Sequence, residues 1–384
     1  MLQRRPPATL GSRRASSSGH QSPPVPDEGN AARGRETRDK ALRHRLAPWS
    51  PDARVSRLTL RPRVHVFTTG GTIAGKPQST GGVAPGLAPE ELLNRIPHAS
   101  AVADVSVEDV SNVASAFIGF GDMLALARRV TAVLADSGVA GVVITHGTGA
   151  LEQTAYFLDV TLGQHRPVVV TGAMRNPTLL SDDGPINLLN AIQVAASPRS
   201  RELGVLVVMN GTIHAAMDVT KTHSSRMDAF DSPEFGPLGA IDEDHVFFAR
   251  RPFRRIPAIL PPAITARVER IPSGADASDL LLKTAIDSGV HGLVVEAGRL
   301  TPRQLDLATR ALAHGTVVVL CNPHGSGRLH RNTYRHTGGE SHLLQLGVIF
   351  AGTPAVKARV KLTVLLSAGL DRERIRDLFH AEWD

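Results

Sequence analysis

Three short segments of the sequence combine hydroxyl side chains, glycines and a lysine in patterns that suit acyl-transfer chemistry. The first, TTGGTIAG at residues 68–75, directly follows an apolar run. Glycines allow a sharp turn and leave backbone N–H groups pointing outward. A hydroxyl such as that of Thr72 would then have both a nucleophilic oxygen and donors for a developing oxyanion. An ordinary glycine-rich turn between a strand and a helix fits the same residues.

The same glycines also match a phosphate-binding loop. Gly70 to Lys76 fits the pattern G-x-x-x-x-G-K, which is typical of nucleotide-binding enzymes. The next residue of that pattern is Ser or Thr, which holds magnesium, but here it is Pro77. Proline also lacks a backbone N–H for a phosphate. A nucleotide-binding enzyme is therefore an alternative that Pro77 argues against.

The other two segments supply a second hydroxyl and the lysine. THGTG at 145–149 follows a second apolar run and precedes a half-buried helical pattern, so Thr148 is expected at the carboxyl end of a strand. A hydroxyl there also commonly serves a turn. In DVTKT at 218–222, Lys221 lies between hydroxyl residues. Partial burial would lower its pKa toward the range of a general base, and the alternative is a solvated surface charge.

The elements that must position these residues alternate between strands and helices from Arg63 onward. Most of the expected strands are continuously apolar, as in a parallel sheet buried on both faces; they are Arg63–Thr68, Gly141–Thr145, Pro167–Thr171, Gly204–Met209, Gly292–Glu296 and Thr316–Leu320. Helical patterns lie near Gly121–Ser137, Leu151–Leu162, Pro185–Ala196, Ala277–Ser288 and Pro302–His314. Ligands bind at the carboxyl ends of the strands in such sheets, which is where the three segments fall.

Composition divides the chain further. Residues 1–62 are rich in Arg, Ser and Pro, which predicts a disordered basic extension. From Met1 to Arg63 there are 14 Lys and Arg against 5 Asp and Glu, a net charge of +9. The overall net charge is +7, so the rest of the chain has a net charge of −2. The Pro- and Arg-rich stretch 250–262 predicts a linker between an N-terminal domain at 63–249 and a C-terminal domain at 263–384.

Several function classes are disfavoured. Because the positive charge lies in the extension and aromatic residues make up only 4% of the chain, a nucleic-acid-binding surface is not expected. The sequence has one cysteine, Cys321, which is expected to be a small buried residue. A single cysteine cannot form a cluster of thiolate metal ligands. His324, His330, His336 and His342 lack the spacing of a metal site. No apolar run is long enough for a membrane span or a signal peptide, so we expect a cytoplasmic protein.

Taken together, the segments resemble the bacterial-type L-asparaginase/glutaminase family. The similar stretches occur in the family's order from about Arg63 to the C-terminus: TGGTIAG at 69–75, ITHGTGALEQTAYFLD at 144–159, PVVVTGAMR at 167–175, SDDGPINLLNA at 181–191, GVLVVMN at 204–210 and DVTKTHSSRMDAFDSPEFGPLG at 218–239. The resemblance implies a larger α/β N-terminal domain with a mostly parallel sheet and flanking helices, and a smaller α/β C-terminal domain. It also implies hydrolysis of L-asparagine to L-aspartate and ammonia without a metal or an organic cofactor, in a homo-oligomer that is a dimer or a tetramer.

The resemblance also assigns roles to single residues. It implies that Thr72 is the nucleophile and that Thr148 and Lys221 assist proton transfer. Ser115, in the stretch 112–117, corresponds to a serine that binds the substrate's α-carboxylate, and Gly71 belongs to the motif that contains the nucleophile. Asp276 falls where a neighbouring subunit is expected to contribute to the site.

One departure from the family bears directly on activity. The family motif is HGTD, whereas here Thr148 is followed by Gly149. The missing carboxylate normally contacts the substrate's amino group and lies beside the Thr–Lys pair. Asp182 or Asp183 would have to lie nearby to compensate, although the second is expected to be structural. Three interpretations follow: a slow asparaginase, an impaired paralogue that binds an amide metabolite, or an amidase for a substrate without a free α-amino group.

Overall fold

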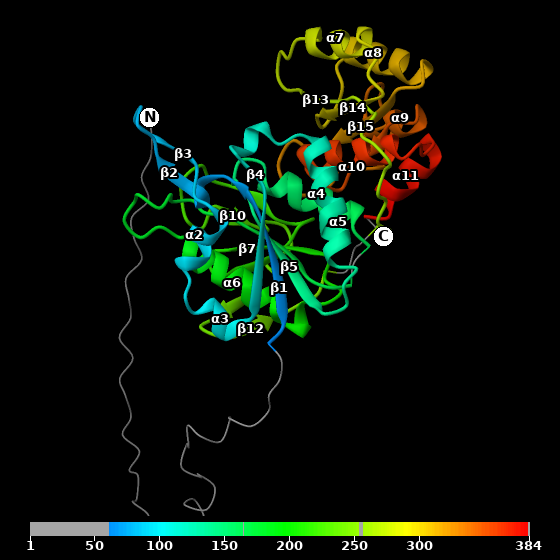
Figure 1. Cartoon of the computed structure of the whole chain (residues 1–384). Helices are drawn as coiled ribbons and strands as arrows, with labels where there is room; N and C mark the ends of the chain where they lie inside the picture. The colour runs from blue at the N-terminus through cyan, green and yellow to red at the C-terminus, as the bar shows by residue number, and fades with distance from the viewer. Residues whose placement is uncertain (1–60, 164, 253–255, 383–384) are drawn as a thin grey trace, which may run out of the picture. The chain divides into compact units, whose positions relative to one another are not determined.

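The computed structural model describes residues 61–163, 165–252 and 256–382, which contain two α/β domains with separate sheets (Figure 1). This confirms the predicted fold class. The predicted basic extension lies outside the described residues, apart from its last two positions. Within the described part of the chain, no helix is both long and apolar enough to cross a membrane.

The larger domain is built on an eight-stranded sheet in the order β12-β11-β8-β7-β6-β5-β1-β4. Its strands are β1 (Arg63–Gly70), β4 (Asp104–Val113), β5 (Val139–Thr145), β6 (Val168–Thr171), β7 (Val205–Met209), β8 (Thr212–Ala215), β11 (Gly239–Asp242) and β12 (His245–Phe248). The five strands from β4 to β7 pair in parallel, and the other three pair antiparallel. Alternate side chains of β1 and β5 enter two different apolar cores, one on each face of the sheet.

Helices cover both faces of this sheet. They are α2 (Pro89–Asn94), α3 (Ala99–Val102), α4 (Phe120–Val133), α5 (Leu151–Thr161) and α6 (Gly184–Ala196). Helices α4 and α5 contribute to one core, and α3 and α6 contribute to the other. Two hairpins lie outside the main sheet, formed by β2 (Gly75–Pro77) with β3 (Val83–Pro85) and by β9 (Thr220–Lys221) with β10 (Phe230–Asp231).

The smaller domain has a four-stranded parallel sheet in the order β13-β14-β15-β16. Its elements are β13 (Val268–Pro272), α7 (Leu280–Asp287), β14 (Gly292–Glu296), α8 (Pro302–Ala313), β15 (Val317–Cys321), α9 (Glu340–Gln345), β16 (Ile349–Phe350), α10 (Ala355–Ser367) and α11 (Arg372–His380). Helix α8 begins at a capping box, because Thr301 Oγ1 accepts from Gln304 N at 3.2 Å and Gln304 Oε1 accepts from Thr301 N at 3.1 Å. Cys321 is fully buried, as predicted.

Helix α10 belongs to the cores of both domains. Val360 and Val364 pack into the core that contains α4 and α5, whereas Leu362 and Leu365 pack into a core of the smaller domain. This position explains why the helix lacks an obvious polar face. It also buries two lysines, Lys357 and Lys361, whose side chains are fully enclosed.

The sequence located the buried strands well and the edge strands poorly. Strand β14 has the predicted bounds, and β15 is shifted by one residue from the predicted Thr316–Leu320. The helix predicted at Gly121–Ser137 ends early, at Val133, and the one predicted from Ala277 begins at Leu280. Strand β4 was missed because its burial alternates between exposed and half-buried positions, which gives it no continuous apolar run.

Candidate active site

Three turns meet at the carboxyl ends of neighbouring strands β4, β1 and β5. Residues 71–72 follow β1, residues 114–115 follow β4, and residues 146–149 follow β5. Gly71 has φ +80, and a Cβ there would lie only 2.3 Å from Gly147 Cα. Only glycine allows this approach, which brings the turn carrying Thr72 against the turn carrying Thr148.

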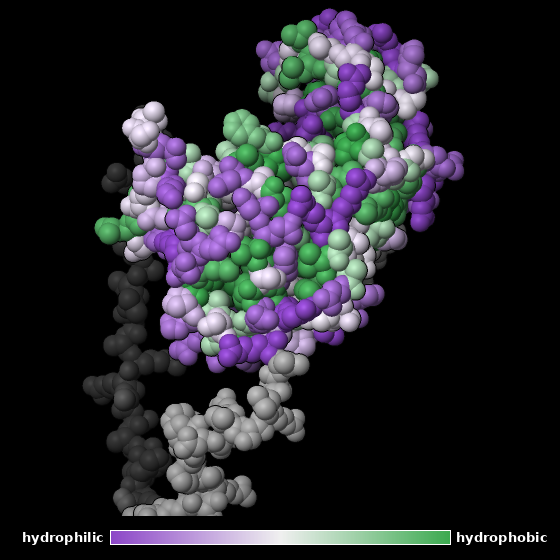
Figure 2. Space-filling view, in the orientation of Figure 1, coloured by the Kyte–Doolittle hydropathy of each residue, from purple (hydrophilic) through white to green (hydrophobic). Residues whose placement is uncertain are grey.

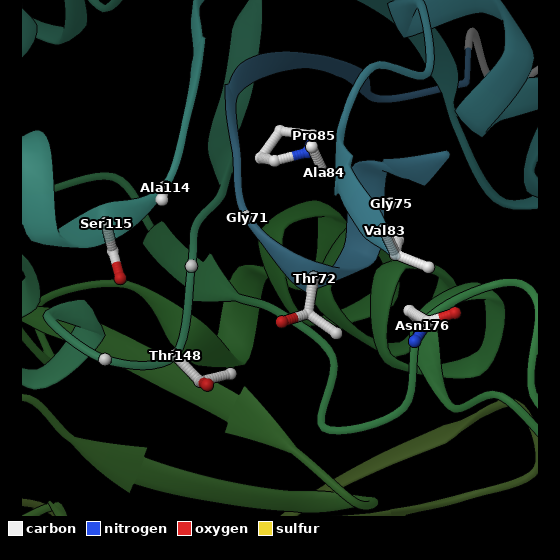
Figure 3. Close-up of a pocket in the computed structure, with 12 residues that line it drawn as sticks. Gly71, Thr72, Gly75, Val83, Ala84, Pro85, Ala114, Ser115, Thr148 and Asn176 are labelled. Atoms are coloured by element: carbon white, nitrogen blue, oxygen red, sulfur yellow. The ribbon is translucent and has the colours of Figure 1, made fainter. Parts of the chain in front are cut away.

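The turns line a pocket of about 260 Å³. In Figure 3, Thr72 projects into the space between Thr148 and Ser115 on one side and Asn176 on the other, with its hydroxyl oxygen on the side of Thr148. Hairpin β2–β3 forms another wall. The lining residues are Gly71, Thr72, Gly75, Val83, Ala84, Pro85, Ala114, Ser115, Gly147, Thr148, Gly149 and Asn176.

Lys221 contacts the pocket through Thr148. Its Nζ donates to Thr148 Oγ1 at 2.8 Å, and its backbone N–H donates to Glu152 Oε2 at 2.9 Å. Burial lowers the pKa of Lys221, and the nearby Glu152 carboxylate opposes that shift. A lysine with a lowered pKa next to a hydroxyl is suited to accept a proton from it.

His146 holds the turn that presents Thr148. It is fully buried, with Nδ1 2.9 Å from Gly147 O and Nε2 3.0 Å from Thr154 Oγ1. Because a carbonyl can only accept, Nδ1 carries the proton and neutral Nε2 accepts from the Thr154 hydroxyl. Burial lowers the pKa of His146 to about 4, which keeps the ring neutral at pH 7. The histidine therefore ties the turn to helix α5.

Asp183 is structural and does not replace the missing carboxylate. Its side chain is buried and accepts from the backbone N–H groups of Met174 and Arg175 and from Asn187 Nδ2, at 2.8–3.0 Å. It thereby fixes the turn that follows β6, which carries Asn176.

Asp182 pairs instead with Arg95 at 2.7 Å. Neither Asp182 nor Asp183 lines the pocket. The hypothesis that one of them compensates for Gly149 therefore receives no support.

Gly149 leaves open space where a side chain would fit. Its φ lies outside the left-handed region, and a Cβ there would meet only Ser115 Oγ, at 3.1 Å. A larger residue is therefore possible after a small movement of the serine. Among the described residues, none that lines the pocket has an ionisable side chain. The lysine behind Thr148 makes this region more favourable to a carboxylate than to an ammonium group.

Comparison with known proteins identifies the family and supports the fold. Residues 63–254 match the family model "Asparaginase, N-terminal", and residues 267–379 match "Glutaminase/Asparaginase C-terminal domain". The chain belongs to the L-asparaginase family. It is 34% identical over 331 residues to L-asparaginase 2 of Escherichia coli, covering 83% of this chain and 93% of that protein.

Further relatives agree with this family membership. The chain is 33% identical over 324 residues to an L-asparaginase of Bacillus licheniformis, covering 83% and 99% of the two proteins. The crystal structure of a probable cytoplasmic L-asparaginase from Campylobacter jejuni matches with a TM-score of 0.74 and 33% identity, covering 83% of this chain and 99% of that one. The chain is thus an asparaginase-like amidohydrolase.

The structure brings most of the predicted site residues together at this pocket. Gly71, Thr72, Ser115, Thr148 and Gly149 all line the pocket. Lys221 reaches it through Thr148.

Asp276 does not line the pocket of its own chain and lies exposed in the turn between β13 and α7. Its expected contribution from a neighbouring subunit stays a prediction.

The phosphate-loop alternative was wrong. A phosphate loop needs a helix directly after the glycines, where backbone N–H groups cradle the phosphate. Here Thr72–Ala74 forms only a short 3₁₀ turn, and the chain continues into strand β2. Lys76 lies on that strand and pairs with Glu91 at 3.3 Å.

Sequence reasoning missed two residues of the site. Glu152 was read only as part of a helical pattern, yet it binds the backbone of Lys221 across 69 positions. Asn176 was not considered, although it lines the pocket; its Oδ1 accepts from the backbone and hydroxyl of Thr178. The position of Glu152 in the first turn after the THGTG motif was the available signal, because that turn faces the strand ends.

Proposed function

We propose that this protein hydrolyses the side-chain amide of L-asparagine through an acyl-enzyme on Thr72. The observation that carries the proposal is the convergence of Thr72 and the Thr148–Lys221 pair on one pocket. A hydroxyl nucleophile needs a base to take its proton, and a partly buried lysine can serve. The names of the relatives supply the choice of L-asparagine.

In the proposed reaction, Thr72 Oγ1 attacks the amide carbon while its proton passes to the Thr148–Lys221 pair. The C–N bond then breaks, and the departing nitrogen takes up a proton to leave as ammonia. Water attacks the resulting ester, which releases L-aspartate and restores the Thr72 hydroxyl. Glu152 contributes by holding the backbone of Lys221.

The donor for the oxyanion is proposed to come from the turns around Thr72 and Thr148. The backbone N–H of Gly71 is already used, since it donates to Val113 O at 3.1 Å. The N–H groups of Thr72 and Gly149 are therefore the ones that we assign to this role. Fixed backbone donors of this kind stabilise a tetrahedral intermediate because they need no reorganisation.

The test is ammonia release from L-asparagine by the purified protein, with Thr72→Ala beside it. Release that disappears in Thr72→Ala supports a threonine-dependent asparaginase. Release that is equal in both proteins contradicts the assigned nucleophile. No release by either protein favours a paralogue that binds an amide without hydrolysing it.

A second candidate substrate class is an amide without a charged α-amino group. It is favoured by the absence of any ionisable side chain among the described residues that line the pocket, together with the open space at Gly149. Succinamate has the amide and the carboxylate of asparagine but lacks the amino group, so it separates the two candidates. Faster ammonia release from succinamate than from L-asparagine would favour this second class.

We also propose a homo-oligomeric, cytoplasmic protein, as a dimer or a tetramer. Large apolar side chains are exposed close in sequence to the pocket residues Ser115 and Asn176, namely Phe117, Leu179 and Leu180, and a second copy would cover them. Figure 2 shows that hydrophobic residues interrupt the hydrophilic surface in several groups. Light scattering of the purified protein tests the assembly, and a monomer at micromolar concentration would contradict it.

A further inference from the structure

A second lysine lies behind the segment that carries Lys221. The side chain of Lys357, on α10, is fully buried. Its Nζ donates to Met217 O at 2.8 Å and to Val219 O at 2.5 Å. Val219 precedes Lys221 by two residues. Lys357 therefore binds the backbone that leads directly to the candidate catalytic lysine.

Hydrogen bonds on both sides fix the backbone of the segment 217–221. The N–H groups of Asp218 and Val219 both donate to Ala215 O at 3.0 Å, which closes the turn after β8. The carbonyls of the same turn accept from Lys357. On the other side, Glu152 accepts from the N–H of Lys221 itself.

Burying Lys357 is costly unless its donors are used. Burial lowers the pKa of Lys357 to about 8, and the surrounding carboxylates, with Glu152 the strongest, oppose that shift. An apolar side chain of similar length would fill this space without the cost of removing an ammonium group from water. The lysine is therefore better explained by what its N–H groups hold than by packing.

We propose that Lys357 is a positioning residue: its two hydrogen bonds fix the backbone at 217–219 so that Lys221 Nζ reaches Thr148 Oγ1. The proposal rests on the proposed function of Lys221. It makes α10 part of the catalytic apparatus, although α10 contributes no residue to the pocket. A small displacement of a catalytic group is enough to lower a rate by one to two orders of magnitude.

The chain offers a matched control one helical turn away. Lys361 is also fully buried on α10, but its Nζ binds Glu382 Oε1 at 2.6 Å and Leu378 O at 2.8 Å. Lys361→Met thus removes a buried lysine without touching the contacts at 217–219. Lys357→Met removes those contacts while keeping the length of the side chain.

We expect Lys357→Met to lower kcat about tenfold or more, with KM within about twofold of the parent. Its pH–rate profile should also shift toward higher pH, because a displaced Lys221 is more exposed to water. Lys361→Met should keep kcat and the profile, even where its Tm falls. Equal kcat and equal pH profiles in the two variants would overturn the proposal.

A second readout does not depend on activity. The reactivity of Lys221 toward an amine-modifying reagent, followed against pH by peptide mass spectrometry, reports the titration of that lysine alone. We expect this titration to move toward the ordinary lysine value in Lys357→Met, and an unmoved titration overturns the proposal.

This labelling also separates the positioning role of Lys357 from the proposed asparaginase activity. If the parent protein has no Thr72-dependent activity, the proposed function is refuted, but the labelling still tests the role of Lys357. Lys357→Gln, which has a shorter side chain, replaces the methionine variant if that protein does not fold, with the same shift expected.

Discussion

Restoring an acidic residue at position 149 should raise the efficiency with which L-asparagine is hydrolysed. The backbone of Gly149 allows a side chain, and the new Cβ would meet only Ser115 Oγ, at 3.1 Å. Rotation of the serine hydroxyl relieves that contact at a cost below about 1 kcal/mol. The Gly149→Asp variant should therefore fold, with its carboxylate on the pocket wall beside Thr148.

The size of the gain follows from the new interaction. A hydrogen bond between a carboxylate and the substrate's ammonium group contributes about 1.5–3 kcal/mol. At about 1.4 kcal/mol for each factor of ten, this predicts about 10- to 100-fold higher kcat/KM for L-asparagine. Most of the gain should appear in KM, because the new charge also raises the pKa of Lys221 and so reduces its neutral fraction at pH 7.

The assay is steady-state ammonia release with L-asparagine and with succinamate. Gly149→Asn is the matched control, since it has nearly the same shape without the charge. The ratio of kcat/KM for L-asparagine to that for succinamate should rise in Gly149→Asp only. Equal ratios in Gly149→Asp and Gly149→Asn, with both proteins folded, would refute the idea that a missing charge limits the use of L-asparagine.

Three further predictions concern pH and stability. Burial holds the pKa of both His146 and His214 at about 4, against 6.5 in the unfolded chain, so the unfolded state binds more protons between these values. The free energy of unfolding should therefore fall by about 1.4 kcal/mol per pH unit for each histidine as the pH drops from about 6.5 to about 4. In urea unfolding, His146→Gln and His214→Gln should each show a smaller change of this free energy with pH than the parent. If neutral Lys221 is the base, kcat should rise with pH and level off below the ordinary lysine pKa, which a pH–rate profile tests. The kcat of Lys221→Arg should be lower by about 100-fold or more at every pH. Asp183→Asn should lower the free energy of unfolding by about 2–4 kcal/mol, because the hydrogen bonds of the Asp183 carboxylate are buried. Asp182→Asn should lower it by less than about 1 kcal/mol, because Asp182 belongs to a partly exposed ion pair. Equal losses in urea unfolding would contradict these assignments.

The buried strands and the pocket turns were predictable because local sequence determines them. Strands β5 and β14 are continuous apolar runs between turn residues, a pattern that a buried parallel strand requires. The glycines at 70–71 and the segment 145–149 mark turns for the same local reason. Five of the seven predicted site residues therefore line one pocket, and Lys221 reaches it through Thr148.

What the sequence did not reveal depends on contacts between distant residues. Glu152 and Lys221 lie 69 positions apart, and Lys357 lies 138 positions from Val219. No local pattern distinguishes these charged residues from solvated ones, since burial comes only from the packing of α5 and α10. The antiparallel strands β8, β11 and β12 were missed because each has only four residues and none is a continuous apolar run.

The most direct test of the central claim is to find which residue becomes covalently modified by an asparagine analogue whose amide is replaced by a reactive diazoketone. Such a group alkylates an activated nucleophile held against it, and a second analogue without the α-amino group covers the other substrate class. The account predicts a single label on the peptide that contains Thr72, absent in Thr72→Ala and weakened in Lys221→Arg. A label on Thr148, or labelling that persists in Thr72→Ala, would contradict it.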